Sequence, residues 1–319
     1  MGRLVFMGSP EFALPSLQLL LDAGHEVVLV LSRPDQPAGR GRTLTPTAVS
    51  AFARARGLPL ETPARLRDPV LRDRLSELRP DLFVVVAYRI LPPSLLAVPR
   101  LGSINLHGSL LPAYRGAAPV ERALWNGEAT TGLTTFLLEQ GVDTGEILGA
   151  TELCIGPDET AGELRERMSR AGAPLLAASV AAVLERRALP RRQPEGEFPL
   201  APKLGPADRL LNFTLPAAHL HNRVRALSPE PGALALFRGQ PLQVLRTSRV
   251  PQAEPGEPGR LQVRAKRLYL ACGDGELEIL ELMPAGRKRL AAQAWLAGAR
   301  LGDTDKLVAA PAPSTGEDT

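Results

Sequence analysis

The sequence is poor in the residues that cross-link chains or bind metals. Its 319 residues contain only 2 cysteines, Cys154 and Cys272, and neither has a histidine or a second cysteine nearby at a metal-ligand spacing. This excludes a disulfide framework, and we expect no zinc and no other bound metal. So few cysteines are typical of a reducing compartment, which predicts a cytoplasmic protein.

A long hydrophobic run is also missing. The longest apolar stretch, 173–184, is interrupted by Ser179 and is shorter than the roughly 20 residues that cross a bilayer. The N-terminus enters a predicted strand directly, without the basic region and long apolar core of a signal peptide. The hydrophobic fraction of 44% and the charged fraction of 23% are ordinary for a soluble globular chain. We therefore expect no membrane partner.

A large charge of one sign is absent as well. Lys and Arg number 38 against 34 Asp and Glu, for a net charge of +4. From Pro206 onwards fifteen basic residues oppose twelve acidic ones, so most of the excess lies in the C-terminal third. A basic C-terminal part suits a nucleic-acid partner, although a coding bias toward arginine explains the numbers equally well.

A dinucleotide-binding fingerprint is missing too. The first predicted βα turn is Gly8-Ser-Pro-Glu-Phe12 rather than Gly-x-Gly-x-x-Gly, which disfavours a plain Rossmann dehydrogenase. Strands are nevertheless predicted at 4–7, 26–31, 82–87, 103–106 and 133–138, and helices at 12–21, 45–56, 68–78, 118–125 and 160–187. We expect Thr45 to be the N-cap of the second helix. This alternation predicts a Rossmann-like α/β domain with a parallel sheet over 1–188.

The pattern changes near residue 189. Five prolines between 189 and 206 predict an extended linker. Beyond it, one helix is predicted at 216–226 and short strands at 233–237, 242–247, 261–263, 268–271 and 276–282. These elements indicate a smaller OB-like β-barrel domain over 207–307. The small and polar residues of 308–319 predict a disordered tail.

The stretch 103–119 carries the strongest chemical signal. Asn105 and His107 are two residues apart on a predicted strand, so both point to the same face. About thirty-five residues later, Asp143 stands alone between Gly141 and Gly145. An amide donor, an imidazole and a carboxylate are the groups an acyl-transfer site needs. Singly, each has a structural alternative, since His107 can be a packed residue and Asp143 a turn residue.

The motifs around these residues are long and ordered. They run Asn105-x-His-Gly-Ser-Leu-Leu-Pro-x-Tyr-Arg-Gly-Ala-x-Pro119 and Gly141-x-Asp-Thr-Gly145, with further matches at 7–13, 34–42, 84–88 and 284–288. Over nearly its full length the chain resembles the folate-dependent formyltransferases, in particular those that act on aminoacylated tRNA. The resemblance implies transfer of the formyl group of 10-formyltetrahydrofolate to the α-amino group of methionyl-initiator tRNA.

The resemblance also implies roles for the three polar residues. Asn105 would donate its amide hydrogens to the oxyanion of the tetrahedral intermediate, and His107, when protonated, would add a charged donor. Asp143 would either hold the imidazole tautomer or accept the proton of the attacking amine. Sequence alone leaves these two roles of Asp143 open.

Two further segments are implied to bind the substrates. The residues implied to line the folate site are Ser109, Leu110, Leu111, Pro112, Val86 and Tyr88. Leu110 and Leu111 are as easily core residues, and Tyr88-Arg89 departs from the Tyr-Gly pattern of the family. Arg40 and Arg42 are implied to contact the tRNA acceptor end, whereas composition alone favours an ordinary solvated loop.

Two other functions compete with this hypothesis. One keeps the folate chemistry but transfers the formyl group to a nucleotide sugar or a glycinamide nucleotide. The other is a non-catalytic oligonucleotide-binding protein with a degenerate α/β domain. The basic loop at 34–42 argues against the first, and the intact Asn105, His107 and Asp143 argue against the second. We expect the protein to be a monomer.

Overall fold

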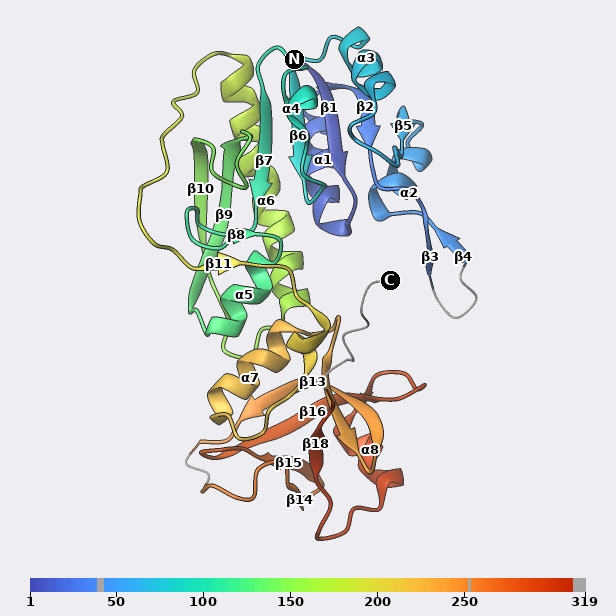
Figure 1. Ribbon diagram of the computed structural model, residues 1–319, viewed down its shortest axis with the longest axis vertical. Helices are drawn as coiled ribbons and strands as arrows, with labels where there is room; N and C mark the ends of the chain where they lie inside the picture. Colours follow the sequence, from blue (N-terminus) through green and yellow to red (C-terminus); the bar gives the residue numbers. More distant parts are fainter. Residues whose placement is uncertain (39–42, 252–253, 312–319) are drawn as a thin grey trace, which may run out of the picture. The chain divides into compact units, whose positions relative to one another are not determined.

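The computed structural model describes residues 1–38, 43–251 and 254–311. The chain forms two compact units (Figure 1). The first contains Met1–Gly116, Thr130–Cys154 and Arg165–Ala201, and the second contains Ala117–Ala129, Ile155–Leu164 and the described residues from Pro202 onwards. The second unit thus takes in two segments from inside the range 1–188, because the helix at 119–126 packs against the helix at 217–226.

The first unit is built on a sheet in the order β10-β9-β7-β6-β1-β2-β5. These strands are β1 (Arg3–Gly8), β2 (Glu26–Leu31), β5 (Leu60–Glu61), β6 (Leu82–Val86), β7 (Ser103–His107), β9 (Thr130–Leu137) and β10 (Ile147–Cys154). The five strands from β7 to β5 are parallel, which confirms the predicted α/β fold. The strand β9 runs antiparallel to β7, and β10 antiparallel to β9.

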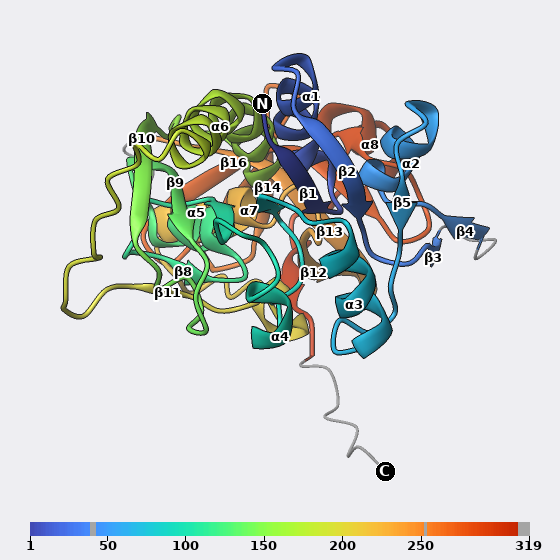
Figure 2. The same cartoon turned by 90° about the horizontal axis from the view of Figure 1, so that it is seen from above.

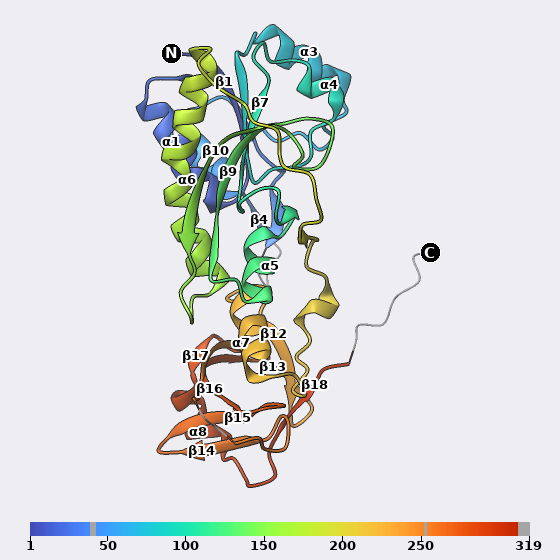
Figure 3. The same cartoon turned by 90° about the vertical axis from the view of Figure 1, so that its left-hand side faces the viewer.

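Helices cover both faces of this sheet. Figures 2 and 3 show α1 (Leu14–Asp22) and α6 (Ala161–Leu184) on one face and α3 (Pro69–Glu77) and α4 (Pro93–Leu96) on the other. Every residue of β6 is buried, as an apolar β-branched run between two helical layers must be. Within the described residues, none of the helices is both long and apolar enough to cross a membrane.

The predicted N-cap of the second helix was wrong. The helix α2 (Ala48–Ala55) begins after Thr47, whose hydroxyl accepts a hydrogen bond from the Ser50 N–H at 3.0 Å. Thr45 instead ends β4 (Thr43–Thr45), which pairs with β3 (Gln36–Ala38). Both threonines suit the cap by residue type, so the turn geometry decided between them. The predicted tRNA contacts Arg40 and Arg42 lie between these strands, outside the described residues.

The second unit contains an antiparallel sheet in the order β14-β15-β16-β13-β12-β18. Its strands are β12 (Ala233–Phe237), β13 (Gln240–Arg249), β14 (Leu261–Arg264), β15 (Arg267–Ala271), β16 (Glu276–Pro284), β17 (Leu290–Ala291) and β18 (Leu307–Ala309). Its core includes Leu220 and Val224 of α7 (Ala217–Ala226), both fully buried. This sheet matches the predicted smaller β domain. The sequence did not predict α8 (Ala292–Ala299) or β18, and β18 takes in Val308 and Ala309, the first two residues of the predicted disordered tail.

The segment at 189–206, predicted as an extended linker, is partly fixed to the first unit. Its β11 (Leu200–Ala201) pairs in parallel with β8 (Arg115–Gly116). Earlier in the segment, Arg191 exchanges two backbone hydrogen bonds, of 2.9 and 2.7 Å, with Ile147 of β10. We call residues 191–201 the closing segment, because it lies against the loop that follows β7 and the loop that carries Asp143.

Candidate active site

The site lies where β7 ends. Asn105 and His107 occupy alternate positions of this strand, so they share a face as predicted. In the sheet, Asn105 stands opposite Val85 of β6 and Phe136 of β9, and it is partly exposed. His107 is the last residue of β7, and its side chain is only 7% exposed.

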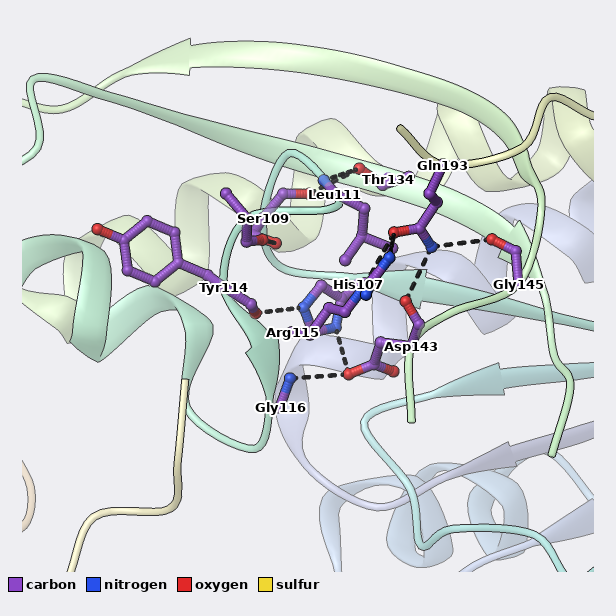
Figure 4. Close-up of polar contacts among 11 residues, drawn as sticks. His107, Ser109, Leu111, Tyr114, Arg115, Gly116, Thr134, Asp143, Gly145 and Gln193 are labelled. Carbon is purple, nitrogen blue, oxygen red and sulfur yellow. Dashed lines mark hydrogen bonds and ion pairs between the residues drawn. The ribbon is translucent and has the colours of Figure 1, made fainter. Parts of the chain in front are cut away.

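The structure brings His107 and Asp143 together. The His107 Nδ1 atom is 3.7 Å from Oδ2 of Asp143, whose side chain is 15% exposed. On its other side, His107 Nε2 is 2.9 Å from the carbonyl oxygen of Tyr114 (Figure 4). A carbonyl oxygen can only accept, so Nε2 carries a proton and donates it. Nδ1 therefore remains free to take up a second proton facing the carboxylate.

Asp143 is held by the loop that follows β7. Its Oδ2 accepts a hydrogen bond of 2.9 Å from the backbone N–H of Gly116. The Asp143 backbone is left-handed, with φ at 54°. Asp and Asn tolerate this conformation better than other side chains do, which suits an aspartate at this position.

The neighbouring Gly145 has little room for any other residue. A Cβ atom at this position would lie 1.7 Å from the carbonyl oxygen of Leu137. The close approach explains why Asp143 is followed so soon by a glycine. The conformation of the Asp143 loop is therefore fixed by its own residue types on one side and by β9 on the other.

The loop predicted to line the folate site follows His107 directly. The Ser109 hydroxyl donates to the Ala113 carbonyl at 2.6 Å, and the Thr134 hydroxyl bridges Ser109 O and Leu111 N at 2.7 and 3.0 Å. Leu111 is 7% exposed, and Pro112 is also buried. Leu110 is half-buried and contacts the backbone at Gly132. Hydrogen bonds within the loop and to Thr134 of β9 thus fix its conformation.

The other predicted wall lies at the end of β6. Val86 is fully buried, and Tyr88 is half-buried with its hydroxyl 3.4 Å from the carbonyl of Ser32. Burial raises the pKa of Tyr88. Arg89, which replaces the glycine of the family pattern, donates to the Tyr88 hydroxyl at 2.9 Å and to the Pro63 carbonyl at 2.7 Å. Arg89 therefore connects Tyr88 to the backbone at Pro63 by hydrogen bonds, which a glycine could not do.

Sequence reasoning missed two residues at this site. Gln193 donates its side-chain amide hydrogens to the carbonyl oxygens of Asp143 and Gly145, at 2.8 and 2.9 Å. Arg115 in turn donates to the Gln193 side-chain oxygen at 2.6 and 3.1 Å. Gln193 lies 50 residues from Asp143 in a proline-rich segment, where no local pattern marks it as part of a site.

A cavity of about 500 Å³ opens beside this loop. Its lining includes Arg115, Thr144 and Gln193, together with three glutamates and Arg192. Among the residues that the structure describes, no three His, Cys, Asp or Glu side chains cluster closely enough to hold a metal ion. Asn105, His107 and Asp143 are groups of the kinds that can move a proton and stabilise an oxyanion, which is the chemistry of acyl transfer.

Comparison with known proteins agrees with this geometry. Residues 2–180 match the family model "Formyl transferase", and residues 203–300 match "Formyl transferase, C-terminal domain". The chain is 45% identical over 302 residues to methionyl-tRNA formyltransferase of Symbiobacterium thermophilum, covering 93% of both chains. It is 42% identical over 306 residues to that of Thermobifida fusca, covering 96% of this chain and 99% of the relative.

The fold is shared more widely than the sequence. The crystal structure of WlaRD, a sugar 3N-formyl transferase in the presence of dTDP and 5-N-formyl-THF, superposes with a TM-score of 0.68 at 17% identity. That match covers 90% of this chain and 99% of WlaRD, and it concerns the fold alone. From the full-length identity to its relatives, the chain belongs to the formyl transferase family and, within it, to the methionyl-tRNA formyltransferases.

Proposed function

We propose that the protein transfers the formyl group of 10-formyltetrahydrofolate to the α-amino group of methionyl-initiator tRNA. The observation that carries this proposal is the identity of 42–45% to relatives named methionyl-tRNA formyltransferase, over almost the whole chain. The His107–Asp143 pair at the end of β7 supports it, because formyl transfer needs a proton acceptor and an oxyanion donor at one carbon atom.

The reaction assigns a task to each of the three polar residues. The neutral amine of the methionyl group attacks the formyl carbon, and the formyl oxygen becomes negative. Asn105 and the Nδ1–H group of protonated His107 donate hydrogen bonds to that oxygen, since His107 Nε2 is already bonded to the Tyr114 carbonyl. Asp143 stabilises the imidazolium at Nδ1 and takes the proton that the amine loses. The bond between the formyl carbon and N10 then breaks, N10 gains a proton, and tetrahydrofolate leaves.

The two substrates have separate places in the proposal. Folate binds at the loop Ser109–Pro112 and at Val86 and Tyr88, where an apolar surface meets backbone groups that can bond the pterin edge. The crystal of WlaRD, which shares the fold, was grown in the presence of 5-N-formyl-THF. The formyl transfer domain is residues 1–188, and residues 207–307 dock the tRNA, with Arg40 and Arg42 at its acceptor end. We place the protein in the cytoplasm as a monomer.

The direct test supplies purified protein with 10-formyltetrahydrofolate and different amines. We expect formylmethionyl-tRNA from initiator Met-tRNA, and no product from a dTDP-amino sugar, a glycinamide nucleotide or free methionine. Omitting the folate is the matched control. Product from the sugar or the glycinamide nucleotide, without product from the tRNA, would replace this function by the corresponding small-molecule one.

A further inference from the structure

Both the backbone and the side chain of Asp143 must be held in place for its carboxylate to face His107. Its left-handed backbone, with φ at 54°, is a sparsely populated state for a residue with a side chain. Such a conformation persists where surrounding contacts impose it. The loop itself offers little packing, since Val142 is 52% exposed. Contacts from elsewhere in the chain therefore add to the restraint that β9 places on the loop at Gly145.

Gln193 supplies these contacts. Its side-chain amide donates to the carbonyl oxygens on both sides of Thr144, those of Asp143 and Gly145. Two hydrogen bonds from one planar group fix the direction of the backbone between them. Without Gln193 the two partly buried carbonyl oxygens would lose this donor.

A closed ring of contacts links Gln193 to the Asp143 carboxylate. Arg115 donates two hydrogen bonds to the Gln193 side-chain oxygen, and the residue after Arg115, Gly116, donates its backbone N–H to Asp143 Oδ2. Gln193 thus restrains Asp143 at its carbonyl, and restrains its carboxylate through Arg115 and Gly116. Figure 4 shows the contacts of Gln193 and of the Asp143 carboxylate beside the His107 imidazole.

The closing segment is anchored to the rest of the first unit on both sides of Gln193. On one side Arg191 is paired with Ile147 through two backbone hydrogen bonds. On the other, the Pro199 carbonyl accepts from the Tyr114 N–H at 2.6 Å, and Ala201 pairs with Gly116. The Tyr114 carbonyl is itself the partner of His107 Nε2. The segment therefore fixes the partners of both nitrogen atoms of the imidazole.

From this geometry we infer that Gln193 is a positioning residue, which sets the distance and direction of Asp143 relative to His107 through the Arg115–Gly116 strand. It does not touch the reacting atoms. The inference rests on the proposed function, since it concerns the pair that performs that reaction. A displacement of about 1 Å in such a pair can lower the rate up to roughly a hundredfold.

The test uses Gln193→Ala and Gln193→Glu in the full-length protein. The alanine removes all contacts, whereas the glutamate keeps an acceptor for Arg115 and loses both donors to the loop. The control is Glu197→Gln, four residues away, an exposed side chain of the same segment that does not line the cavity. We expect both Gln193 variants to lower kcat by about tenfold to a hundredfold, with KM for folate and tRNA nearly unchanged. The control should retain the wild-type values.

A double-mutant cycle separates positioning from general damage. Single-turnover rates are measured for Gln193→Ala, Asp143→Asn and the combination. If Gln193 acts through Asp143, its replacement has little further effect once Asp143 is already changed. Effects that multiply in the double variant would overturn the inference. So would a KM that rises as far as kcat falls, or loss of folding in both Gln193 variants.

A readout without substrate distinguishes this inference from the proposed function. The imidazole NMR signals of His107, assigned by their loss in His107→Gln, should shift in both Gln193 variants and stay in place in Glu197→Gln. Unchanged signals would refute the positioning role whatever the enzyme's substrate. If instead the wild type fails to formylate Met-tRNA while the signals shift, the proposed function fails and the positioning role stands.

Discussion

Replacing Asp143 by Asn gives the sharpest test of the site. Asn has the same shape and tolerates the left-handed backbone with φ at 54°, so the loop should keep its conformation. The amide oxygen can still accept the hydrogen bond from Gly116. The change therefore removes the charge that faces His107 and leaves the rest of the structure in place.

The expected magnitude follows from the distance between the two groups. His107 Nδ1 and Asp143 Oδ2 are 3.7 Å apart, and both side chains are largely buried. Two unit charges about 4 Å apart interact by about 4 kcal/mol at an effective dielectric constant of about 20. Since about 1.4 kcal/mol is tenfold in rate, the upper limit is roughly a thousandfold. We expect a loss of at least roughly a hundredfold in kcat, since part of the interaction is present before the transition state.

The assay measures formylmethionyl-tRNA formed at saturating folate, with tRNA and enzyme concentrations varied. Folate affinity should be unchanged, which a titration of each protein checks independently. Wild-type activity should fall on acidification, because the attacking amine then takes up a proton and loses its free electron pair. A kcat of the Asn variant close to the wild-type value would leave Asp143 as a turn residue and refute the reasoning.

Three further predictions follow from the same structure. Asn105→Ala and His107→Ala should each lower formyl transfer by at least roughly a hundredfold while circular dichroism stays native, because each removes an oxyanion donor; wild-type turnover in either folded variant would contradict the assignment. The exposed turn Arg287–Lys288 between β16 and β17 should contact tRNA phosphate. Changing both residues to Ala should therefore reduce the slope of the logarithm of the tRNA binding constant against the logarithm of the salt concentration by roughly 1–2, without effect on folate binding. An unchanged slope would exclude the contact. Burial alone would raise the pKa of Glu163, but hydrogen bonds, first of all from Arg246, lower it from 4.5 to about 2. The Glu163 carboxylate therefore stabilises the fold above pH 4.5, and this contribution is lost as the pH falls toward 2. The unfolding free energy of Glu163→Gln should depend less on pH in that window than that of the wild type. Equal pH dependence of the two proteins would show that the Glu163–Arg246 pair contributes nothing.

Local sequence signals predicted the central sheet well. The run at 82–86 is apolar and β-branched, and it forms a strand that is buried along its whole length. The strand β10 was missed because it lies at the edge of the sheet. Its residues alternate between partly and fully exposed, and it contains Gly149, so neither hydrophobicity nor propensity marks it. An edge strand is defined by its neighbour, which sequence periodicity does not record.

The residues of the site likewise fall into those that a local sequence pattern marks and those that it does not. Asn105, His107 and Asp143 were singled out because a strand end and a glycine-flanked turn are local patterns, and the structure brings the histidine and the aspartate within 3.7 Å. Gln193 is joined to Asp143 by contacts across 50 residues. Such a contact depends on where the chain returns after α6, and no pattern within the proline-rich segment encodes that return. The functional roles of all these residues await the experiments above.

The position of the closing segment has a consequence for the order in which the protein matures during synthesis. The whole parallel sheet has been made once residue 107 has left the ribosome, and Asp143 follows soon afterwards. The hydrogen bonds to Gln193 must wait for 50 more residues, and the pairing of Ala201 with Gly116 must wait longer still. Any fragment that ends at residue 188 would contain the candidate catalytic pair without the contacts that hold it. A fragment intended to retain these contacts should therefore extend at least to Ala201.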